Sequence, residues 1–158
     1  MKVAIGYKIQ NGPWGGGNAF VKSLSEFLKK KGHDVVYDLN DNDIDIILII
    51  DPRSNHPNVT FTPAAIIRYL LFKNSNAIVI HRINECDQRK NTKTMNFRLR
   101  IANFCSDHTV LVGSWLTFQQ LLEHMWYVVR ALSPATVEML TETVAVSDFM
   151  VLECAKTS

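Results

Sequence analysis

Cysteine is scarce in this 158-residue chain, and its three copies, Cys86, Cys105 and Cys154, form no CxxC pair. Three cysteines cannot all pair with one another, which argues against a disulfide framework. The missing CxxC spacing likewise argues against a structural zinc site. We therefore expect a protein of the reducing cytoplasm, with no metal and no bound cofactor.

Long apolar runs are also missing, since none approaches the roughly 18 residues of a membrane span. The opening Met1–Tyr7 is too short for a signal peptide and has no small-residue cleavage site, so it predicts a first strand. Asn58-Val59-Thr60 matches a glycosylation acceptor, but without a secretion signal the match carries no meaning. We expect no transmembrane segment.

A strong charge of one sign is absent as well. The net charge is +2, and the one basic run, Lys29–Lys31, stands at the end of a predicted helix. Such a run suits the negative end of a helix, so we expect no nucleic-acid partner. The common catalytic motifs GxGxxG, GxSxG and HExxH do not occur, and the catalytic residues stay unknown. Four histidines show no metal-ligand spacing and indicate helix ends or surface: His33, His56, His108 and His124.

What the sequence does contain is ordinary globular composition, 47% hydrophobic and 20% charged, in alternating strand and helix patterns. Predicted strands cover 2–7, 33–39, 44–50, 77–83 and 108–112, and predicted helices cover 18–31, a segment from Thr62–Pro63, 92–105 and 115–124. Strict alternation predicts the α/β class, a Rossmann-like doubly wound parallel sheet. The β-branched run Ile44–Ile50 predicts a central strand with helices over both faces.

Helix-end signals support these bounds. Asn18 is expected to cap the first helix and Gly32 to close it. Thr62 and Pro63 predict the N-cap and first turn of the second helix. Cys105 falls on an apolar stripe of the third helix and is expected in the core, whereas Cys86 falls in a polar loop and is expected to be accessible.

The pattern changes toward the C-terminus. Residues 1–113 carry 15 basic and 10 acidic side chains, and residues 114–158 carry 2 and 5. We divide the chain into a domain at 1–125 and a divergent segment at 126–158. Residues 115–154 keep many large apolar side chains, from which we predict either packing of this tail on the domain or a homodimer contact.

Ligands of open parallel sheets bind at the carboxyl ends of the strands, where three segments of this sequence fall. The turn at 12–18 has three successive glycines, Gly15–Gly17, whose flexible backbone and helix N-terminus suit a phosphate; the alternative is a flexible turn. Eight of the eleven residues at 80–90 have hydrogen-bonding or ionisable side chains, which suits a hydroxyl-rich ligand; the alternative is a solvated loop. Asp51 follows the central strand and either orients a loop or joins the site.

These two loops resemble the N-terminal domain of group 1 (family 4) glycosyltransferases. The resemblance rests on Gly-Pro-Trp-Gly-Gly-Gly-Asn at 12–18 and His-Arg-Ile-Asn-Glu-Cys-Asp-Gln-Arg-Lys at 81–90, and continues through the helix at 95–107 and the turn at 110–116. It covers about residues 1–118. It implies one half of a GT-B fold, in which this half receives the sugar or glycan acceptor and a second domain holds the nucleotide-sugar.

The resemblance also implies roles for residues. The loop facing the donor phosphates and the acceptor would be Gly15, Gly16, Gly17 and Asn18. The acceptor side would be lined by Asp51, His81, Arg82, Asn84, Glu85, Asp87 and Arg89. Such enzymes transfer sugar with retention and without a metal, and basic groups and helix dipoles stabilise the leaving phosphate.

The chain also departs from that family. No two of its glutamates stand eight positions apart, as the donor-binding half would require, so we expect the isolated chain to be inactive as a hexosyltransferase. The working hypothesis is the acceptor-side half of a sugar transferase with a missing donor-domain partner. The alternatives are a non-catalytic module that binds sugar, nucleotide or phosphate, and a self-associating structural remnant.

Overall fold

The structure is a computed structural model and describes residues 1–12, 15–87 and 91–112. Its centre is a five-stranded sheet of β1 (Lys2–Ile5), β2 (Asp34–Val36), β3 (Ile46–Ile49), β4 (Ile78–Ile83) and β5 (His108–Leu111). All pairs are parallel, in the order β2-β1-β3-β4-β5. The predicted α/β sheet and its central strand are therefore confirmed, whereas the elements expected beyond residue 112 lie outside the described residues.

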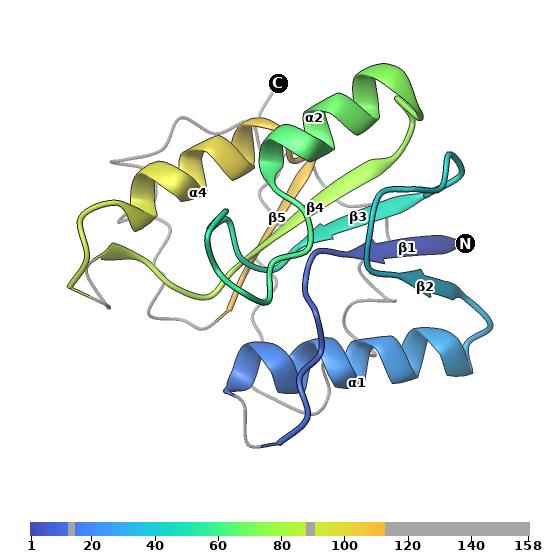
Figure 1. Cartoon of the computed structure of the whole chain (residues 1–158), viewed down its shortest axis with the longest axis horizontal. Helices are drawn as coiled ribbons and strands as arrows, with labels where there is room; N and C mark the ends of the chain where they lie inside the picture. The colour runs from blue at the N-terminus through green and yellow to red at the C-terminus, as the bar shows by residue number, and fades with distance from the viewer. Residues whose placement is uncertain (13–14, 88–90, 113–158) are drawn as a thin grey trace, which may run out of the picture.

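Helices cover both faces of the sheet (Figure 1). Helix α1 (Gly16–Lys30) joins β1 to β2 and lies on one face. Helices α2 (Pro63–Phe72) and α4 (Met95–Phe104) follow β3 and β4 and lie on the other. The chain passes from β1 to β2 on one side of β1 and then returns to place β3 on the other side. The reversal places a topological switch point between β1 and β3, where parallel sheets commonly bind ligands.

Strand β3 shows why its sequence is continuously apolar. Ile46 and Leu48 belong to the core cluster that packs against α1, together with Val21 and Leu24 of that helix. Ile47 belongs to the opposite cluster, under α2 and α4, and none of its surface is exposed. Side chains alternate between two buried faces, so both faces must be apolar.

The helix ends agree with the sequence in part. Thr62 caps α2 as predicted, and its hydroxyl accepts from the Ala65 amide at 3.4 Å. Gly32 closes α1 with a φ of +80°, a conformation that glycine adopts without strain. The predicted cap Asn18 is wrong, because α1 begins at Gly16 with Gly15 as its N-cap.

No helix within the described ranges is long and apolar enough to cross a membrane.

Candidate ligand-binding site

The loops that follow β1, β3 and β4 leave the sheet at the same edge, because the three strands are parallel. This edge, which we call the carboxyl edge, lies to the left in Figure 1. It carries the start of α1, the loop from Asp51 to Thr62 and the loop that begins at Asn84. Segments that are far apart in the sequence thus meet beside the switch point.

The N-terminus of α1 has no side-chain cap and no acidic residue in its first turn. Among the described residues, added Cβ atoms at Gly15, Gly16 and Gly17 would meet nothing within 4 Å. The first-turn N–H groups of a helix lack the partner one turn earlier that later N–H groups have, and together with the helix dipole they favour an anion. Here the N–H of Asn18 already donates to the Gly15 carbonyl at 3.0 Å, so Gly16 and Gly17 supply the N–H groups in question. The backbone at this end is therefore open to close approach by a phosphate oxygen.

The conformation of these glycines differs from the expectation. Gly15 has a φ of −56°, and Gly16 and Gly17 are helical, so none of the three adopts a positive φ. The left-handed glycine of this loop is Gly12, with a φ of +105°. Close approach, rather than an unusual backbone conformation, is what the three glycines permit.

Asn18 has a structural role that its sequence position did not reveal. Its side-chain oxygen accepts from the Gln10 amide at 2.7 Å, and its Nδ2 donates to the Gln10 carbonyl at 3.0 Å. The Gln10 side chain in turn donates to Oδ1 of Asn58 at 2.9 Å. We call Asn18, Gln10 and Asn58 the amide chain. It fastens the start of α1 to the loops after β1 and β3.

Asn58 is the buried end of the amide chain, only 2% exposed. Its Nδ2 donates to the Tyr7 hydroxyl at 3.0 Å, and its carbonyl accepts from the Lys8 amide at 2.7 Å. Its own N–H donates to Nδ1 of His56 at 3.3 Å. A side chain so enclosed cannot accept a glycan in the folded protein.

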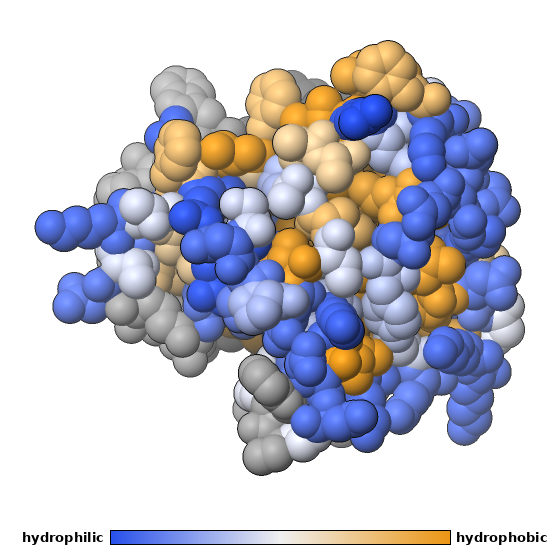
Figure 2. All heavy atoms as spheres, in the orientation of Figure 1, coloured by the Kyte–Doolittle hydropathy of each residue, from blue (hydrophilic) through white to orange (hydrophobic). Residues whose placement is uncertain are grey.

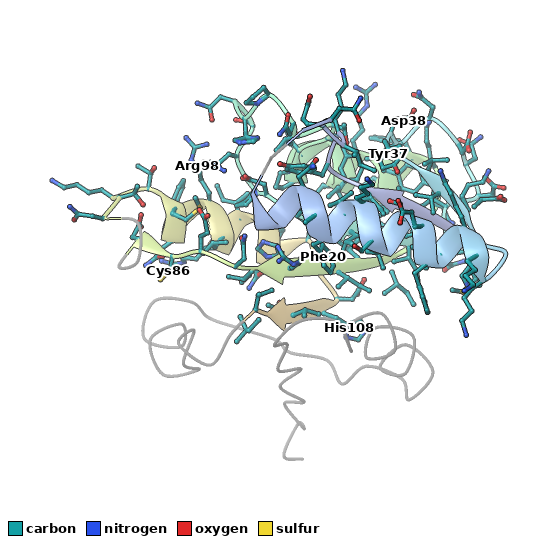
Figure 3. The ribbon with its side chains drawn as sticks, turned by 90° about the horizontal axis from the view of Figure 1, so that it is seen from below. Phe20, Tyr37, Asp38, Cys86, Arg98 and His108 are labelled. Carbon is teal, nitrogen blue, oxygen red and sulfur yellow. The ribbon has the colours of Figure 1, made fainter. Side chains whose placement is uncertain are left out.

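Arg82 brings a buried positive charge against Phe20, the fifth residue of α1. It lies in β4 and is 6% exposed, and its guanidinium carbon stands 4.4 Å from the centre of the Phe20 ring. Figure 3 shows Phe20 on α1, which lies across this face of the sheet. Burial lowers the pKa of Arg82 to about 10, against the opposing effect of Glu85. The group is therefore charged at neutral pH, and Phe20 supplies a cation–π contact.

A second basic residue stands in the loop after β3. Arg53 is paired with the carboxylate of Asp51 through its Nε, at 2.9 Å and 3.0 Å, and through Nη2. Hydrogen bonding to Asp51 raises the pKa of Arg53 against the effect of partial burial, with weaker contributions from Glu85 and Tyr7. Asp51 thus orients its own loop, and Glu85 lies within the electrostatic reach of both arginines.

His81 lies inside the protein rather than on the carboxyl edge. It is in β4, none of its surface is exposed, and its Nδ1 is hydrogen-bonded to Oδ1 of Asn103 in α4. Burial lowers its pKa to about 4, although Asn103 and Asp51 both favour the charged form. Within the described ranges its Nε2 has no hydrogen-bond partner.

Asp87 holds the start of α4. Its two carboxylate oxygens accept from the amides of Met95 and Asn96, each at 2.9 Å, and from the hydroxyl of Thr92. Desolvation raises the pKa of Asp87, but these hydrogen bonds outweigh it and keep the pKa below its usual value. Its carboxylate is therefore taken up by the protein's own backbone.

Of the two cysteines in the described ranges, one departs from expectation. Cys86 is buried, 6% exposed, in a small core cluster with Met95 and Leu99, so the predicted accessibility is wrong. Cys105 packs against the core under α2 and α4 as expected, and burial raises its thiol pKa to about 11. The raised pKa keeps the Cys105 thiol protonated at neutral pH, and we assign no chemistry to either cysteine.

The predicted site residues therefore fall into separate groups. Beside the switch point the structure places Gly15–Gly17, Asn18 and Asp51. Arg82 contacts Phe20 of α1, and Glu85 interacts electrostatically with Arg82 and Arg53. Asn84 is half-buried after β4. His81 and Asp87 face the interior and the start of α4, and Arg89 lies outside the described residues. Figure 2 shows hydrophilic side chains over the loops on the left of the molecule.

Sequence reasoning missed four residues at this edge: Tyr7, Gln10, His56 and Asn58. No local pattern marks them, because their contacts join residues up to 51 positions apart. In the part of the chain that the structure describes, no cluster of three or more His, Cys, Asp or Glu side chains could hold a metal ion.

The chain matches no protein-family model, no curated protein and no solved structure. The likeness of its two loops to glycosyltransferases therefore stays a hypothesis.

Proposed function

We propose that the carboxyl edge binds a phosphorylated sugar, and that the chain is the acceptor-side half of a retaining sugar transferase with a nucleotide-sugar donor. One observation carries the binding proposal. The N-terminus of α1 has no side-chain cap, and the buried guanidinium of Arg82 contacts the ring of Phe20, the fifth residue of that helix. Two sources of positive potential at one place favour a phosphate.

The sugar part of the ligand has partners close by. Glu85, Asn84 and Asp51 follow β4 and β3 at the same edge and are each half-buried. Carboxylate and amide groups accept from and donate to sugar hydroxyls. A phosphate at α1 and hydroxyls at these side chains would together fix the orientation of the ligand.

The transferase assignment rests on the resemblance of the loops at 12–18 and 81–90. In this role, the first-turn amides of α1 and the charge of Arg82 stabilise negative charge that develops on a leaving phosphate. The chain has no pair of glutamates eight positions apart, so we expect ligand binding without sugar transfer until a donor-binding domain is supplied.

Titration calorimetry tests the binding proposal. Glucose 6-phosphate should bind more tightly than inorganic phosphate or methyl glucoside, because it uses both parts of the edge. UDP-glucose tests the donor in the same way, and we expect no release of UDP. Absence of saturable binding by any of these ligands would refute the proposal.

A matched pair of variants makes the test specific. Gly17→Ala adds a Cβ that meets no atom of the described residues within 4 Å, so the fold should persist. The added methyl group should obstruct the phosphate, and affinity should fall about tenfold, the effect of one charge-assisted hydrogen bond. Ser23→Ala, on the exposed side of the same helix, is the control and should bind like the wild type. Equal affinities for both variants would contradict an anion at this end of α1.

Self-association is a second candidate, with an observation of its own. Phe97, Ile101 and Phe104 recur at helical spacing on α4 and are 64%, 44% and 85% exposed. Figure 2 shows hydrophobic side chains along the top of the molecule, over α4 and α2. Analytical ultracentrifugation should detect a dimer that Phe104→Lys weakens. A monomer at high micromolar concentration would reject this candidate.

A further inference from the structure

His56 stands in the loop after β3, at the switch point, and is held on two sides. Its ring stacks on Tyr7, with the ring centroids 6.3 Å apart and an interplanar angle of 28°. Its carbonyl accepts from the Val59 amide at 3.0 Å, which closes a turn. The imidazole is therefore mounted on a fixed piece of backbone rather than on a free loop.

The hydrogen bond from Asn58 determines which ring nitrogen carries the proton. The backbone N–H of Asn58 donates to Nδ1 of His56 at 3.3 Å. A nitrogen that accepts a hydrogen bond holds no proton, so the neutral ring carries its proton on Nε2. The contact thus makes Nε2 a donor.

The Nε2 donor of His56 can therefore serve another molecule. His56 is half-buried, and within the described ranges no hydrogen bond to its Nε2 is made. In the same loop, the Arg53 side chain is paired with Asp51. The amide chain connects His56 through Asn58 and Gln10 to Asn18 at the start of α1.

We propose that His56 donates a hydrogen bond from Nε2 to a hydroxyl oxygen of the sugar whose phosphate lies at α1. This inference rests on the proposed function and adds a residue that recognises the sugar part of the ligand. An N–H donor of a neutral ring suits a hydroxyl, whereas the phosphate already has the positive end of α1. His56 acts by contact with the ligand, and Asn58 acts as the positioning residue behind it.

The test uses His56→Phe, which keeps an aromatic ring against Tyr7 and removes the donor. We expect affinity for glucose 6-phosphate to fall about fivefold, the effect of one neutral hydrogen bond. Affinity for inorganic phosphate should not change. His56→Gln, which restores an N–H donor, should recover part of the loss.

Gly17→Ala separates this inference from the proposed function. It should weaken inorganic phosphate and glucose 6-phosphate alike, whereas His56→Phe should weaken only the sugar phosphate. Unchanged binding of glucose 6-phosphate by His56→Phe, or an equal loss for inorganic phosphate, would overturn the role of His56 alone. No binding by the wild type would overturn both proposals. An NMR spectrum with the His56 ring proton on Nδ1 would also overturn the role of His56.

Discussion

Gln10 and Asn58 are joined by a 2.9 Å hydrogen bond from the Gln10 side-chain amide to Oδ1 of Asn58, across 48 positions of sequence. Because Gln10 also bonds twice to Asn18, one residue ties the start of α1 to the loop after β3. These two segments flank the switch point of the sheet. The relative position of the proposed phosphate and sugar contacts therefore depends on amide groups that contact no ligand.

The amide chain gives the first prediction. Asn58→Ala leaves the Tyr7 hydroxyl without its donor and the Gln10 side-chain amide without its acceptor. The free energy of unfolding should therefore fall by about 2 kcal/mol. The NMR signals of Gly16 and Gly17 should also shift, because Gln10 bonds to Asn18. Urea denaturation measures the first effect. Asn42→Ala, at an exposed asparagine, is the control, and an equal loss in that variant would contradict the prediction.

The burial of His81 predicts a pH dependence of stability. Its pKa is lowered to about 4 in the folded protein, from an ordinary value near 6.5. Between these values the unfolded chain binds a proton that the folded protein does not. The free energy of unfolding should therefore fall as the pH drops from 6.5 to 4, by an amount on the order of 3 kcal/mol, and His81 adds no further loss below pH 4.

Urea denaturation at several pH values checks this window. His81→Gln, which cannot take up that proton, should flatten the pH dependence between 6.5 and 4. His33→Gln, at a half-exposed histidine, should leave it in place. Asp87 acts in a lower range, because its pKa is below the usual carboxyl value and its contribution is lost as the pH falls through that folded value. An unchanged slope in His81→Gln would refute the assignment.

The start of α4 depends on Asp87. Asp87→Ala removes the acceptor of two backbone amides, those of Met95 and Asn96, and should destabilise the protein by about 1 kcal/mol, as for the loss of a helix cap. Asp87→Asn keeps one carbonyl oxygen and should cost less. Hydrogen exchange of the Met95 and Asn96 amides is the direct readout. Equal exchange in Asp87→Ala and the wild type would show that α4 holds its first turn by other means.

Gly6 and Phe61 are packed too closely for a larger residue at position 6. A Cβ on Gly6 would stand 2.9 Å from Cε2 of Phe61 and 3.2 Å from the Leu48 carbonyl oxygen. Gly6→Ala should therefore destabilise the protein by about 1–3 kcal/mol. In a Phe61→Leu background, Gly6→Ala should cost less stability than it does in the wild type. Thermal unfolding measures each, and additivity of the two changes would contradict the contact.

The fold was predictable because the sheet is built from short apolar runs that local patterns reveal. The central strand, the covering of both its faces and the Thr62 cap all follow from residue types. Strand lengths could not be predicted from residue types, because pairing with the neighbouring strand sets them. The expected strand at 33–39 is observed only over Asp34–Val36, opposite Lys2–Ala4 of the short strand β1.

The site was predictable only in outline. The sequence places Gly15–Gly17 and the loop after β4 at one edge, since both follow parallel strands. It does not reveal that Asn18 bonds to Gln10 instead of capping α1, or that Asn58 is buried. Cys86 was misjudged for the same reason, because Met95 and Leu99 from α4 cover it. Such contacts arise from tertiary packing, which polar loop composition does not encode.

The all-parallel register has a consequence for how the chain folds. In the described sheet, Lys2 lies opposite Asp34, Ile46 opposite Ile78 and Ile80 opposite His108, so each pairing must wait for an intervening helix or loop. Closing such long segments costs entropy before any strand pairing compensates it, which slows folding. During synthesis, β1 cannot gain its second neighbour until Ile46–Leu48 has left the ribosome. Its apolar residues Val3 and Ile5 stay available to other chains until then, so the nascent protein is exposed to aggregation while β1 lacks this neighbour.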